Sequence, residues 1–195
     1  SGARRFVFEG RECGGHVGPR TSAILWQQAV DAVLDHFGPE GEIDCDLIFA
    51  GGVHDATSGA MVSALSAELA ARGARIGVIV GTGYILTREA VATGAILEDY
   101  QKLALGSDRT VLLESAPGHA TRVVQSPVVD EFLAEKRRLN AGQVNPDEVR
   151  DRLEAFNIGR SRIASKGIDR NPEFGKREGV EKVIRLDVRD PLATG

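Results

Sequence analysis

Short apolar runs that end in glycine constrain the fold of this chain most. Three of them, residues 5–9, 46–50 and 76–80, run into Gly10, Gly51 and Gly81. Segments with apolar residues at helical spacing lie between these runs. An alternation of strand-like and helix-like segments is typical of βαβ units and a parallel sheet. We therefore predict an α/β fold.

Helices are predicted between the strands from spacing and capping residues. One begins after Thr21 or Ser22 and ends before Gly38. A second covers about residues 58–72, with Met61, Leu65 and Leu69 on one stripe and Gly73 closing it. A shorter helix starts at Thr87, and residues 110–114 form the fourth strand of the series.

The character of the chain changes after Pro127. Residues 128–140 and 146–156 are charged and amphipathic, which predicts two helices. The tail from residue 165 to 195 has many charges and one short apolar run at 183–186. We therefore assign residues 1–125 to the α/β part and residues 126–195 to a helical appendage and tail.

Charge and cysteine content exclude several classes of function. A net charge of −4 with scattered Lys and Arg gives no footprint for nucleic acid or an anionic membrane. No apolar run approaches the roughly 20 residues that cross a bilayer, and we expect a cytoplasmic protein. Cys13 and Cys45 lack CxxC spacing, so free thiols and no metal site are expected.

The sharpest motif is the stretch GRECGGHVG at residues 10–18, directly after the first strand. Glycines let the backbone approach a flat or anionic ligand, and the carboxyl ends of parallel strands are where α/β active sites lie. His16 is therefore a candidate general base or hydrogen-bond donor. The alternative is a histidine that only packs in a turn.

Two further glycine motifs follow the second and third strands. They are Ala50-Gly51-Gly52 and Gly81-Thr82. Successive backbone N–H groups at neighbouring strand ends, with helix amino termini behind them, can hold a cofactor phosphate. Each pair alone is also explained by the steric needs of a strand-to-helix turn.

Together these motifs carry a resemblance. The order strand, xExxGGHxG, strand, AGG, helix, strand, VGT resembles the nitronate monooxygenase (2-nitropropane dioxygenase) family, which are FMN-binding TIM barrels. The resemblance implies FMN as the cofactor and His16 as the catalytic residue at the flavin. It implies FMN contacts from the following residues: Gly14, Gly15, Gly51, Gly52, Gly81 and Thr82.

The stretches VHDATSGAMVSAL, IGVIVGTGYILTREAV and ESAPGHATR look like the branch found in polyketide- and fatty-acid-synthase-type proteins. Because the GGH motif opens the later strands in that family, we expect residues 1–125 to be the later half of a (β/α) TIM-type barrel, without its amino-terminal half. Open strand edges would then favour self-association or contact with other domains of a synthase.

The resemblance leaves three functions open. The first is an FMN-dependent oxidoreductase, nitronate monooxygenase-like, that oxidises an activated carbon acid as a small molecule. The second is an FMN-dependent enoyl reductase that acts on acyl chains bound to a carrier. The third is a non-catalytic or incomplete barrel segment.

Five other residues have weaker signals. His119 and Arg122 follow the fourth strand and could meet a ligand at the same rim, or be structural. Glu12 could orient His16 or cap a turn. His54 and Asp55 are expected to start a helix, because Asp is a favoured cap.

Overall fold

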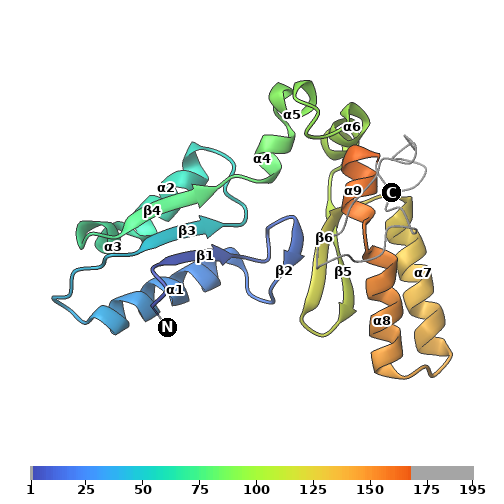
Figure 1. Cartoon of the computed structure of the whole chain (residues 1–195), viewed down its shortest axis with the longest axis horizontal. Helices are drawn as coiled ribbons and strands as arrows, with labels where there is room; N and C mark the ends of the chain where they lie inside the picture. The colour runs from blue at the N-terminus through green and yellow to red at the C-terminus, as the bar shows by residue number, and fades with distance from the viewer. Residues whose placement is uncertain (1, 168–195) are drawn as a thin grey trace. The chain divides into compact units, whose positions relative to one another are not determined.

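The computed structural model describes residues 2–167 (Figure 1). The predicted tail beyond residue 167, with its apolar run at 183–186, lies outside the described residues. Contacts divide the described chain into two compact units. Residues 2–84 with Gly118–Arg122 form the first, and residues 85–117 with 123–167 form the second.

The first unit contains a parallel sheet. Strands β1 (Arg5–Glu9), β3 (Asp46–Ala50) and β4 (Arg75–Ile79) pair in the order β1-β3-β4, with β3 in the middle (Figure 1). Phe8 pairs with Phe49, which in turn pairs with Val78. The first two predicted strands are confirmed at the expected bounds, and the third is shifted by one residue.

Helices α1 (Ser22–Phe37), α2 (Ala56–Leu65) and α3 (Ala67–Ala71) supply the rest of this unit's core. Phe49, Leu47 and Leu69 are fully buried. The ring of Trp26 meets the Phe49 ring edge-on at 6.0 Å, and its Nε1 donates to the Phe8 carbonyl at 3.3 Å. Burial of these large apolar groups is the main force that holds helices and sheet together.

The predicted stripe on the second helix is wrong at one position. Met61 is 61% exposed, whereas Val62 is buried. The single helix expected over residues 58–72 is divided at Ser66, whose hydroxyl donates to the Val62 carbonyl at 2.7 Å. Gly73 closes the segment at φ +100°, as predicted.

A second sheet contains strands that the sequence analysis did not place there. It consists of β2 (Gly15–Val17), β6 (His119–Val124) and β5 (Thr110–Ala116), in the order β2-β6-β5. β2 and β6 pair antiparallel. The expected fourth strand of the parallel series is thus β5, which lies in this second sheet. Pro117 and Gly118 reverse the chain directly after β5, with φ +80° at Gly118, so β5 pairs with the next strand, β6.

The fold is therefore mixed α/β, with one parallel sheet and one sheet with antiparallel pairing. Within residues 2–167 the strands do not close into a barrel. The prediction that residues 1–125 form the later half of a TIM-type barrel is not confirmed. The predicted boundary at residue 125 stays a prediction.

The second unit is mainly helical, and Figure 1 shows its longest helices, α7 and α8. Its helices are α5 (Arg88–Ala92), α6 (Glu98–Gly106), α7 (Pro127–Ala141), α8 (Pro146–Asn157) and α9 (Arg160–Lys166). Both predicted amphipathic helices are confirmed as α7 and α8, each with proline in its first turn. Phe132 and Leu153 are fully buried between them.

Candidate functional site

The carboxyl ends of β1 and β3 meet through two glycines. The Gly10 N–H donates to the Ala50 carbonyl at 2.9 Å. A methyl group on Gly10 or on Gly51 would overlap Ser22, the first residue of α1. Gly51 also has a φ of +115°, which disfavours any residue with a side chain. Close packing and backbone conformation thus explain both glycines without a ligand.

Glu12 holds the amino terminus of α1. Its carboxylate accepts hydrogen bonds from the backbone N–H of Ser22 at 2.7 Å and from the Ser22 hydroxyl. Burial alone would raise the pKa of Glu12, but the hydrogen bonds from Ser22, helped by the charge of Arg122, outweigh it and lower that pKa. Of the two roles considered for Glu12, the structure shows capping.

The loop that precedes His16 is fixed from two sides. The Arg11 N–H donates to the Arg20 carbonyl at 2.9 Å. The Arg122 guanidinium donates to the Arg11 carbonyl from Nε at 3.0 Å and from Nη2 at 2.8 Å. Arg122 therefore has a structural role in this loop, and its predicted contact with a ligand stays a prediction.

His16 lies on β2 rather than in a loop. It pairs with Thr121 of β6, and its side chain is exposed. Val17 and Ala120, the next pair along, are buried. Because alternate residues of a strand face opposite sides, His16 is on the open side of this ribbon. His119 is exposed on the same strand as Thr121.

The segment that follows β4 lies near Gly14, in the loop before β2. A Cβ placed on Gly14 would be 3.9 Å from the Thr82 hydroxyl, and one on Gly83 would be 3.9 Å from the His54 Cβ. Gly81 and Thr82 are exposed, and a Cβ on Gly81 would meet nothing within 4 Å. Gly14 and Thr82, two of the residues predicted to contact FMN, thus lie near each other.

Asp55 caps α2, as predicted. Its carboxylate accepts from the Ser58 N–H at 2.8 Å, and the Ser58 hydroxyl donates back into the same turn. These hydrogen bonds from Ser58 lower the pKa of Asp55. His54 Nδ1 lies 2.8 Å from the Gly52 carbonyl oxygen. The amino terminus of α2 is therefore already occupied by a carboxylate of the chain.

The predicted FMN residues fit a phosphate group to different degrees. A Cβ on Gly15 or Gly81 would point into open space, so the backbone there can be approached by a ligand. A Cβ on Gly52 would instead meet Glu12 at 3.6 Å. The residues that fit best are Gly14, Gly15, Gly81 and Thr82.

Sequence pattern did not indicate Ser22 as a residue at these strand ends. It is 5% exposed and touches Gly10, Gly51 and Glu12 at once. It was considered only as a possible cap, and no local pattern indicates that serine at the start of one helix packs against two strand ends.

The two cysteines have different surroundings. Both Cys13 and Cys45 are free, and Cys45 is buried. Burial, followed by the nearby Glu9 and Glu12 carboxylates, raises the pKa of Cys13 to about 11. Such a thiol is a poor nucleophile at neutral pH. Across residues 2–167, no three His, Cys, Asp or Glu side chains gather as metal ligands.

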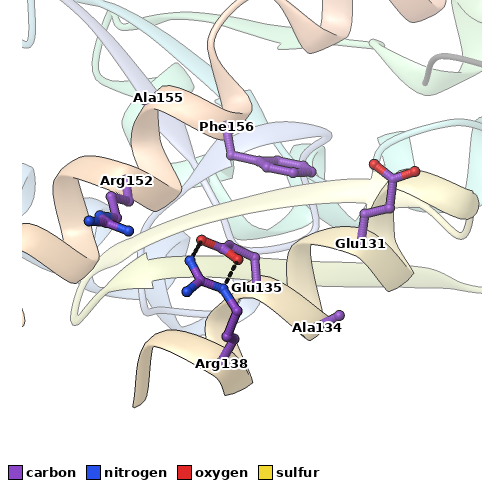
Figure 2. Close-up of a pocket in the computed structure, with 7 residues that line it drawn as sticks. All are labelled: Glu131, Ala134, Glu135, Arg138, Arg152, Ala155 and Phe156. Atoms are coloured by element: carbon purple, nitrogen blue, oxygen red, sulfur yellow. Dashed lines mark hydrogen bonds and ion pairs between the residues drawn. The ribbon is translucent and has the colours of Figure 1, made fainter. Parts of the chain in front are cut away.

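A surface groove lies on α7 and α8 of the second unit (Figure 2). Its lining residues are Glu131, Ala134, Glu135, Arg138, Arg152, Ala155 and Phe156. Arg138 donates to both oxygens of Glu135, at 2.6 and 2.7 Å. None of the site residues predicted from the sequence lies in this groove.

The searched part of the chain contains no helix with the length and apolarity to cross a membrane.

No protein-family model matches the chain. Two curated proteins are similar to it, each 30% identical over 131 residues, or 67% of this chain. Both have the name (3aS,4S,5R,7aS)-5-hydroxy-7a-methyl-1-oxo-octahydro-1H-indene-4-carboxyl-CoA dehydrogenase, one from Rhodococcus jostii (strain RHA1) and one from Mycobacterium tuberculosis (strain ATCC 25618 / H37Rv). The matched region is 31% and 32% of their lengths, so the chain spans about a third of each.

Proposed function

We propose that this chain is part of an FMN-dependent oxidoreductase that acts on an activated carbon acid, with His16 as the base. The observation that carries the proposal is the exposed His16 on β2, directly after a loop whose Gly14 approaches Thr82, the first residue of the short helix α4 (Thr82–Ile85) that follows β4. The dehydrogenase names of the two relatives support oxidoreductase chemistry. The resemblance to nitronate monooxygenases supports FMN, and with it the later half of a (β/α) barrel.

The proposal gives each residue a role. Gly14, Gly15, Gly81 and Thr82 would contact FMN through an open backbone. Bound FMN would supply the electron acceptor. His16 would remove the proton from the carbon acid, and its place on a paired strand limits the directions in which its ring can point.

The similar dehydrogenases favour a thioester among the substrate classes. Their name describes a CoA thioester. The carbon next to a thioester carbonyl is itself an activated carbon acid, so this substrate class agrees with His16 as a base. It also agrees with the second candidate, an enoyl reductase that acts on acyl chains bound to a carrier.

The first experiment is a titration of the purified chain with FMN, followed by removal of the excess and a visible spectrum. Retained flavin bands support the proposal. A folded protein that stays colourless contradicts the proposal for this chain and favours the non-catalytic alternative.

A second experiment distinguishes the two candidate enzymes, by anaerobic addition of a nitroalkane, an acyl-CoA or a reduced nicotinamide to the flavin-bound form. Bleaching by a nitroalkane or an acyl-CoA indicates carbon-acid oxidation, and bleaching by nicotinamide indicates an enoyl reductase.

Gly81→Val tests the flavin contact. A valine there costs little folding energy, because nothing lies within 4 Å of its Cβ position and Gly81 is not among the glycines of positive φ. We therefore expect loss of flavin with an unchanged fold. Gly106→Val, at the end of α6 and equally open, is the matched control and should keep the flavin. Equal flavin retention by both variants would refute the assignment of Gly81.

His16→Ala tests the base in the flavin-bound form. Loss of a general base lowers turnover by about 10²-fold or more. The imidazole is exposed, so the variant should keep its fold and its flavin. Bleaching by the carbon acid at the wild-type rate would exclude His16 as the base.

A further inference from the structure

We propose that His16 and His119 form a two-imidazole site for the conjugate base of the substrate, in which His119 binds the oxygen that gains negative charge when His16 removes the proton. This inference rests on the proposed function and adds a second residue that contacts the substrate. It follows from the pairing of β2 with β6.

The strand register places both histidines on one face. Gly15 pairs with Arg122, His16 with Thr121, and Val17 with Ala120. Directly paired residues share a face, and so do residues two apart on one strand. His119 is two residues from Thr121, so it is on the His16 face.

Burial agrees with this assignment. Val17 is 7% exposed and Ala120 is 4% exposed, which identifies the opposite face as the packed one. His16 and His119 are both exposed. The turn at Pro117 and Gly118 fixes the position of His119, because it ends where β6 begins. Both histidines belong to the first compact unit.

The spacing fits a small planar anion. Diagonal neighbours on one face of an antiparallel pair lie about 7–8 Å apart, close enough for two long side chains to reach a common group between them. The Thr121 hydroxyl is on the same face, directly across from His16. Imidazole N–H groups donate well to oxyanions. This arrangement suits an enolate of a 3-oxoacyl thioester, whose two oxygens lie in one plane.

The chemical step balances without a further reagent. The C–H bond next to the thioester carbonyl breaks, and its proton moves to the His16 imidazole. The electron pair delocalises onto the carbonyl oxygen, which accepts a hydrogen bond from His119. A preformed donor at an oxygen that gains charge is a common source of catalysis. The described part of the chain has no third ligand to make this pair a metal site.

The test uses the full chain with acetoacetyl-CoA as the probe. Binding is followed by the ultraviolet absorbance of the enolate and by the NMR signals of the four imidazoles. We expect the enolate absorbance to rise and the signals of both His16 and His119 to shift. His119→Ala should lower the enolate population about tenfold or more, as expected when a hydrogen bond to a charged group is lost. His119→Gln keeps an N–H donor and should recover part of it.

His36→Ala is the control. His36 lies at the end of α1, where its ring packs on Phe37, so its loss should leave the enolate signal unchanged. The proposal is overturned if folded His119→Ala matches the wild type, or if the probe shifts His16 but not His119. Flavin retention without any histidine response would refute this inference alone. Histidine responses without flavin retention would support it and refute the FMN proposal.

Discussion

Replacing Gly51 by alanine should strongly destabilise the first unit. Gly51 directly follows β3 and has a φ of +115°, where an L-residue is strained by about 1–2 kcal/mol. The added methyl would overlap the Ser22 hydroxyl and lie 3.2 Å from the Gly10 nitrogen and 3.3 Å from the Cys13 sulfur. Overpacking of this kind costs about 1–3 kcal/mol. The sum is about 2–5 kcal/mol, a large share of the roughly 5–15 kcal/mol that holds a typical domain folded.

Urea unfolding followed by tryptophan fluorescence measures this cost. Trp26 is the single tryptophan of the chain and packs on Phe49 in the core of the first unit, so its emission reports on that unit. The midpoint should fall while the slope m stays unchanged. Gly81→Ala is the matched control and should stay within about 0.5 kcal/mol of the wild type, because its Cβ position is open.

A double mutant separates the steric cost from the backbone cost. Ser22→Ala removes the atom nearest to the added methyl, although it also removes a hydrogen bond to Glu12. In the Ser22→Ala background, Gly51→Ala should therefore cost about 1 kcal/mol less than in the wild type. A Gly51→Ala variant that unfolds at the wild-type midpoint would show that Gly51 does not pack closely against Ser22.

Three further predictions concern the same loop. Glu12→Gln keeps an oxygen that can accept from Ser22 but removes the negative charge at the start of α1, so it should lower stability by about 0.3–1 kcal/mol at pH 7. Because the pKa of Glu12 is lowered from 4.5 in the folded chain, the difference in unfolding free energy from the wild type should shrink as the pH falls below 4.5. Arg122→Met should speed hydrogen exchange at the Arg11 amide, since the two donors to the Arg11 carbonyl are lost; an unchanged exchange rate would contradict the fixed loop. Cys13 should react with iodoacetamide about 100-fold more slowly than an ordinary thiol of pKa 9.0, because its pKa is about 11; mass spectrometry of timed samples measures the rate.

The local sequence pattern was sufficient to predict two strands of the parallel sheet. Residues 5–9 and 46–50 are apolar, short and followed by glycine, and both form strands at those bounds. The same reasoning placed Gly73 at a helix end and Asp55 at a helix start. In each case the signal lies within a few residues of the feature, so no knowledge of distant contacts was needed.

The pairing of strands that lie far apart in the chain could not be predicted from the sequence. β2 has three residues and pairs with β6, more than 100 positions away in the chain. A three-residue segment has no periodicity of its own, so the sequence does not indicate that His16 lies on a strand. The break at Ser66 was missed for a different reason, because serine is tolerated inside helices and the sequence does not indicate that its hydroxyl donates to the Val62 carbonyl.

The roles of the glycines show why sequence alone could not delimit the site. Gly51 and Gly81 both end apolar strands, and the sequence gives them the same meaning. In the structure, Gly51 has a positive φ and packs against Ser22, whereas Gly81 faces open space. Only the second arrangement leaves the backbone accessible to a ligand.

The two capping carboxylates, Glu12 and Asp55, limit the places where a phosphate group could bind. Glu12 occupies the start of α1 and Asp55 the start of α2, so neither helix terminus is free to attract a phosphate. A second negative charge at either place would be repelled. Under the proposed function, an FMN phosphate would be held by the backbone at Gly81 and Thr82, beside Gly14, and not by the amino termini of α1 and α2. For this reason Gly81→Val separates a flavin site from an inherited but empty glycine motif more sharply than any change at Gly51, where loss of flavin would be indistinguishable from loss of the fold.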